Sequence, residues 1–168
     1  MESLLMAISY NSLVSSKTRY VVTLLSGTSW TVPTGCLYVN ATLIGGGAGG
    51  GYAGNAAFTP LTSGFGGQKI TSNITTTPGA SIAYAIGAGG AGATSGAYYS
   101  TAGGTTTFTG ATSAAGGPRS NYYDVGAVGL TSTPNAGESV SNGGQGAWTT
   151  YVAAQSGSAG KIELEYWV

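Results

Sequence analysis

Residues 37–51, LYVNATLIGGGAGGG, contain the pattern that decides the fold. Apolar and polar side chains alternate from Leu37 to Ile44, which predicts a strand with one face in a core. The next seven residues are glycine except for Ala48, so the strand continues into chain with almost no side chains to pack. The protein therefore combines β-strands with glycine segments that require another kind of order.

Five further stretches show the period of two that is typical of strands: residues 20–25, 29–32, 69–77, 81–86 and 161–168. We expect residues 20–25 and 29–32 to be neighbours, and residues 69–77 and 81–86 to form a hairpin through Pro78-Gly79. In the last stretch Ile162, Leu164 and Tyr166 share one face. Together these patterns predict an all-β fold, a single antiparallel β-sandwich or jelly-roll-like domain.

Glycine accounts for 31 of the 168 residues and charged residues for 6%, against usual shares of about 7% and 25%. Three long glycine-rich stretches, residues 45–67, 87–104 and 114–160, connect the predicted strands. Such runs can stay flexible, or they can form extended rods of polyproline-II geometry whose bare backbones hydrogen-bond laterally. The low charge favours order, because flexible linkers are usually more polar. We expect ordered, polyglycine-II-like segments.

Several classes of function conflict with the composition. Five basic and five acidic residues leave no net charge and no basic stripe, so no nucleic acid partner is expected. The absence of histidine and the single cysteine, Cys36, exclude a zinc site and a histidine-dependent catalytic triad within the chain. The GAGGAG of residues 87–92 matches a dinucleotide-binding motif only by composition. We expect no enzyme, metal or cofactor.

Two features of the sequence bear on localisation. No apolar run of about 18 residues occurs, so no membrane insertion is expected. Residues 1–18 lack the basic and continuous apolar regions of a signal peptide, which places synthesis in a cytoplasm without export by that route. These residues are nevertheless rich in apolar side chains and too short to fold alone. We expect an attachment arm at residues 1–18, ahead of a glycine-rich β domain at residues 19–168, with contacts through Leu4, Leu5, Ile8, Tyr10, Leu13 and Val14.

Aromatic residues within the glycine-rich stretches are the candidate binding residues, because rigid rings on an adaptable backbone are typical of binding loops. The same rings could instead cap a core of glycine rods, and both interpretations stay open. Arg119 and Asp124 bracket residues 120–123 in a long neutral region, so this loop is the first candidate for a contact. The full set comprises Tyr52, Phe58, Phe65, Tyr98, Tyr99, Arg119, Tyr122, Tyr123, Asp124, Trp148 and Tyr151.

The order of GTSWTVPTGCLYVNATLIGGGAGGG, QKITSNITTTPGASIAYAIGAGGAG, GGTTTFTG and GKIELEYWV resembles the glycine-rich domain of bacteriophage tail fibres, tail-tip adhesins and other virion proteins. The resemblance covers residues 23–168. It implies a protein on the virion surface that contacts other virion proteins, forms a homo-oligomer, with a trimer favoured, and touches a host receptor. A capsid decoration protein with a purely architectural role is the alternative, and an ice-binding protein is a remote one.

Overall fold

The computed structural model describes residues 17–51, 64–94, 99–119 and 154–168, and these form two antiparallel sheets without a helix. The first sheet has the order β1-β7-β3-β4, and the second has the order β2-β5-β6. The strands are β1 (Arg19–Leu24), β2 (Ser29–Thr31), β3 (Tyr38–Ile44), β4 (Lys69–Thr75), β5 (Ser81–Ala85), β6 (Thr107–Phe108) and β7 (Lys161–Trp167). The predicted all-β sandwich is therefore confirmed.

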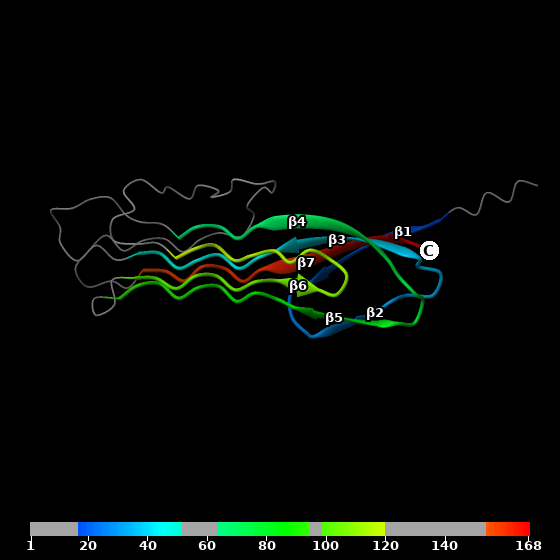
Figure 1. Ribbon diagram of the computed structural model, residues 1–168, viewed down its shortest axis with the longest axis horizontal. Coiled ribbons are helices and arrows are strands. Elements are labelled where there is room, and N and C mark those ends of the chain that lie inside the picture. The colour runs from blue at the N-terminus through cyan, green and yellow to red at the C-terminus, as the bar shows by residue number, and fades with distance from the viewer. Residues whose placement is uncertain (1–16, 52–63, 95–98, 120–153) are drawn as a thin grey trace, which may run out of the picture.

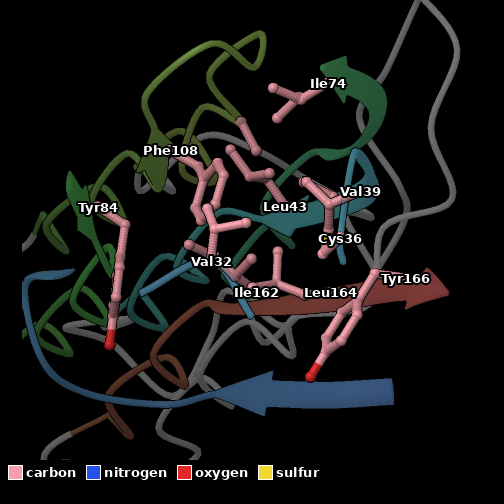
Figure 2. Close-up of a cluster of buried hydrophobic side chains, with 12 residues drawn as sticks. Val32, Cys36, Val39, Leu43, Ile74, Tyr84, Phe108, Ile162, Leu164 and Tyr166 are labelled. Carbon is pink, nitrogen blue, oxygen red and sulfur yellow. The ribbon is translucent and has the colours of Figure 1, made fainter. Parts of the chain in front are cut away.

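The core lies between the two sheets (Figure 2). The alternating residues Val39, Ala41 and Leu43 of β3 are fully buried, as are Ile162 and Leu164 of β7. Aromatic rings from the second sheet close the core, because the Trp30 ring lies 6.2 Å from that of Phe108 and 5.6 Å from that of Tyr166. Burial raises the pKa of Tyr166 above its ordinary value of 10.0, with smaller effects of the same sign from Cys36 and Tyr20.

Two predicted strand pairings are wrong, because both connections cross between the sheets. Residues 20–25 and 29–32 are not neighbours in a sheet, since β1 pairs with β7 and β2 pairs with β5. Residues 69–77 and 81–86 are not a hairpin, since β4 pairs with β3. The turn at Pro78-Gly79 does form, with the N–H of Ala80 donating to Thr77 and Gly79 at a φ of +80°. Its two flanks then diverge into different sheets.

Six glycine-rich segments extend side by side from the sandwich, and we call them the rods (Figure 1). They comprise residues 45–51, 64–68, 87–94, 99–105, 114–119 and 154–160. Rod 45–51 is buried along its whole length. Its N–H groups turn to a new neighbouring rod at each residue and return to the same rod after three. The donor–acceptor pairs, at 2.8–3.1 Å, are Gly45–Gln68, Gly46–Gly104, Gly47–Ser158, Ala48–Phe65, Gly49–Thr101 and Gly50–Gln155.

This three-residue period identifies polyproline-II geometry, which has three residues per turn and leaves its backbone groups free to bond sideways. Burial in rod 87–94 follows the same period. Gly87, Gly90 and Ala93 are buried, whereas Ala88, Ala91 and Thr94 are exposed. The predicted polyglycine-II-like order is therefore present in the described rods.

Glycine is required in the rods because there is no room for a side chain, and not because of a left-handed backbone. A methyl group at Gly90 would overlap the carbonyl oxygen of Thr101 and lie 2.9 Å from the nitrogen of Gly49. Methyl groups at Gly45 and Gly117 would likewise overlap carbonyl oxygens of neighbouring rods. A positive φ among the described glycines occurs only at Gly27, Gly35, Gly79 and Gly110, outside the rods. The bundle therefore depends on the close approach of bare backbones.

We expect Gly90→Ala to destabilise the protein by about 3 kcal/mol, because the added methyl must push two rods apart and break their hydrogen bonds. Ala91→Ser is the matched control, since residue 91 is exposed on the same rod. Urea unfolding of both variants measures the difference. Equal free energies of unfolding would contradict steric exclusion as the reason for glycine at position 90.

Thr106 joins the rods to the sandwich and is fully buried. Its hydroxyl donates to the carbonyl of Ile44 at 2.7 Å and accepts the N–H of Gly87 at 3.0 Å. Its backbone exchanges two hydrogen bonds with Ala114. Thr106 therefore connects the starts of two rods through its side chain and the start of a third through its backbone.

Thr106→Val should cost about 3 kcal/mol of unfolding free energy, because the N–H of Gly87 and the carbonyl of Ile44 both lose a buried partner. Thr106→Ser keeps the hydroxyl and should cost about 1 kcal/mol for the lost methyl group. Thermal or urea unfolding compares the two variants. If serine were as damaging as valine, the hydroxyl would not be the stabilising group.

Candidate functional site

The candidate binding surface is the far end of the rod bundle. The chain passes out of the described rods at residues 51, 94 and 119 and re-enters them at residues 64, 99 and 154. Rods 45–51, 87–94 and 114–119 run away from the sandwich, and the other three run back (Figure 1). Residues on either side of all three glycine-rich connections therefore meet at one end of the molecule.

Two predicted contact residues come together at this end. The guanidinium carbon of Arg119 lies 5.3 Å from the centroid of the Tyr99 ring, which is a cation–π contact. Tyr99 is 53% exposed. Rods 99–105 and 114–119 position the pair through the N–H of Gly103, which donates to Gly117 at 2.9 Å. Among the described rod residues, Arg119 is the charged one, and it makes no ion pair with the described part of the chain.

The contact with the Tyr99 ring restricts the Arg119 guanidinium. Stacking on a ring restricts a guanidinium in one direction and leaves its edge N–H groups available to a ligand. The exposed Tyr99 ring adds apolar contact area with few rotatable bonds. Chemically, the pair can bind a carboxylate, a phosphate or a carbonyl-rich surface.

The other predicted contact residues divide into two groups. Phe65 is half-buried on rod 64–68, and its carbonyl accepts the N–H of Ala48 at 2.8 Å, so its backbone belongs to the bundle. The remaining candidates lie outside the described residues: Tyr52, Phe58, Tyr98, Tyr122, Tyr123, Asp124, Trp148, Tyr151 and, in the arm, Leu4, Leu5, Ile8, Tyr10, Leu13 and Val14.

A second surface lies at the opposite end of the sandwich and was not predicted. Lys17, Leu37, Tyr38 and Trp167 line a groove of about 170 Å³ on the outer face of the first sheet. Thr18 already belongs to this sheet, because it exchanges two backbone hydrogen bonds with Val168, at 2.8 and 3.1 Å. The sequence does place Trp167 on the outward face of its strand, but it does not show that Tyr38 lies beside it.

Both carboxylates of β7 form ion pairs with basic side chains on the outer face of the first sheet. Glu165 forms an ion pair with Arg19, and Glu163 one with Lys161 at 2.6 Å. Within the described residues, no group of three or more metal-binding side chains occurs. In that same part of the chain, no helix has the length and apolar character to cross a membrane.

A family model described as a glycine-rich domain matches residues 23–165. The chain belongs to this family. The match includes β2 to β6, all six rods, the last two residues of β1 and the first five of β7. A search of curated proteins gave no match. Because the family description names a composition and not an activity, the role of this glycine-rich domain remains to be proposed from its structure.

A double-mutant cycle on Arg119→Gln and Tyr99→Leu should give a coupling energy of about 0.5–1 kcal/mol in unfolding free energy, the usual value for an exposed cation–π contact. The neighbouring variant Pro118→Ala, combined with Tyr99→Leu, is the control and should be additive. Strictly additive effects of the first pair would show that the two side chains do not stabilise each other.

Proposed function

We propose that this glycine-rich domain protein is a non-enzymatic component of a phage virion surface, of the tail-fibre or tail-tip type, that contacts a host receptor. The sandwich end attaches the protein to other virion proteins, together with the arm at residues 1–18. The far end of the rod bundle contacts the host surface. The observation that carries the proposal is the convergence of all six rods on one end, where Tyr99 and Arg119 meet.

The rods support this role because they are a stiff spacer. Seven residues of polyproline-II geometry span about 20 Å, at about 3.1 Å per residue. Rod 45–51 is hydrogen-bonded to all five other rods along this length, as donor to three of them and as acceptor from two. Loops that start from such a base lose less conformational entropy on binding than loops on a mobile stalk. A rigid base also transmits force between a particle and a surface without unravelling.

The opposite end of the molecule supports attachment. Exposed apolar side chains gather there, including Leu37 at 50% and Tyr38 at 55% exposure. Apolar patches on a protein surface are typical of contacts with other subunits. The resemblance to virion proteins agrees with this division into an attachment end and a display end, because such proteins need both.

The same apolar end also favours the second candidate, a decoration or minor structural protein whose contacts are all with virion subunits. The two candidates differ at the rod end, which contacts a host in the first and other subunits, or nothing, in the second. The described rods do not favour an ice-binding role, since rod 87–94 exposes Ala88, Ala91 and Thr94 instead of a row of threonines.

Particles that carry Tyr99→Ala together with Arg119→Ala should adsorb to host cells at least tenfold more slowly, because both anchors of the display end are lost. Lys161→Ala, which removes an exposed positive charge on β7, should adsorb normally. Adsorption kinetics of purified particles measure the effect, and mass spectrometry confirms that each variant is incorporated.

Normal adsorption of the double variant would reject receptor contact through this pair and leave the architectural role. Absence of the protein from purified particles would reject both virion roles. Removal of residues 1–18 should abolish incorporation while the β domain remains folded, as judged by its near-UV circular dichroism.

A further inference from the structure

Exposed apolar side chains are concentrated at one end of the sandwich. Of the seven large hydrophobic side chains that are exposed in the described residues, five lie on or next to the parts of β1, β3 and β7 that pair with one another at the end opposite the rods. These five are Tyr20, Val21, Leu37, Tyr38 and Trp167. The other two, Leu25 and Tyr99, lie elsewhere. Such a concentration at one end of a protein marks an interaction surface.

The sheet register explains why part of this surface is a groove. Val39 of β3 lies opposite Tyr166 of β7, so the next residues, Tyr38 and Trp167, are neighbours on the outer face. Lys17 and Leu37 complete the walls. The lining is therefore mainly apolar, and its volume of about 170 Å³ is suited to one or two apolar side chains.

The chain itself contains a segment that fits this groove. Residues 1–16 precede Lys17, a wall of the groove, and they carry the apolar side chains of Leu4, Leu5, Met6, Ile8, Tyr10, Leu13 and Val14. Their charged residue is Glu2, which is complementary to Lys17. Sixteen extended residues span about 50 Å, enough to reach a neighbouring molecule.

We propose that residues 1–16 of one copy dock in the groove of a second copy, so that arm exchange holds copies of this protein together. The geometry favours a second copy over the same one. β1 is at the edge of the sheet, and β7 separates it from Tyr38 on β3. Thr18 pairs with Val168, so Lys17 lies just past the last residue of β7, Trp167.

To cover its own groove, the arm would have to reverse direction next to Lys17, whose side chain already forms a wall. An arm from another copy reaches the groove without that reversal. When every copy gives an arm and receives one, the assembly closes by symmetry and no groove is left exposed. This inference uses the same arm and the same end of the sandwich as the proposed attachment, but its partner is a second copy of this chain, so it is tested without a particle.

The test uses the full chain and two matched leucines. Leu37→Asp places a charge in the groove, whereas Leu25→Asp places one at the other end of β1, where Leu25 is 67% exposed. In analytical ultracentrifugation the natural chain and Leu25→Asp should sediment as the same oligomer. Leu37→Asp should sediment as a monomer, with an apparent dissociation constant at least a hundredfold weaker.

A synthetic peptide of residues 1–16 provides the direct probe. In excess, it should dissociate the oligomer of the full chain, and a scrambled peptide of equal composition should not. A monomeric natural chain overturns the exchange between copies. An oligomer that resists both the peptide and Leu37→Asp overturns the groove as the docking site. The receptor role and the arm exchange fail independently. Normal oligomerisation of the Tyr99→Ala, Arg119→Ala variant with defective adsorption supports the receptor role alone, and a monomeric Leu37→Asp variant supports the arm exchange whatever its adsorption.

Discussion

The structure depends on lateral hydrogen bonds between backbones that have no side chains to hold them apart. Rod 45–51 donates to three neighbouring rods in turn and repeats after three residues. This is possible because a polyproline-II helix leaves every N–H and C=O pointing outward. Buried backbone groups must find partners, and four of the six acceptors used by rod 45–51 are more than 50 residues away in the sequence, such as Ser158 for Gly47. The rods therefore stabilise one another, and none of them is expected to keep its conformation without its neighbours.

The sandwich fixes where the rods begin. β3, whose last residue is Ile44, leads directly into the central rod, and β7 starts directly after Gly160. Thr106 couples this boundary to rod 87–94 through its buried hydroxyl and to rod 114–119 through its backbone. The small core of β-strands thus supplies the hydrophobic stabilisation that glycine cannot provide. The rods in return extend the fold away from the core, where Tyr99 and Arg119 stack on each other.

The two ends of the molecule consequently have different chemistry. The sandwich end has an apolar groove between Tyr38 and Trp167, and the rod end has an aromatic ring, a guanidinium group and the starts of three connections. A bundle whose own surface is mostly Gly, Ala, Ser and Thr separates them. The proposed attachment at one end and the proposed recognition at the other both rely on this separation.

The sequence by itself determined the strands that alternate strictly, the all-β class and the rods, because periods of two and runs of glycine are local properties of the chain. A period of three was also readable in GAGGAGAT at residues 87–94, where the exposed positions hold Ala88, Ala91 and Thr94. β6 was missed because two residues show no period. Only the tertiary structure decided that β4 and β5 belong to different sheets, that Arg119 stacks on Tyr99, and that Tyr38 lies beside Trp167. These pairings depend on which distant backbones hydrogen-bond to each other, and glycine-rich segments, which have no distinctive side chains, do not encode their partners locally.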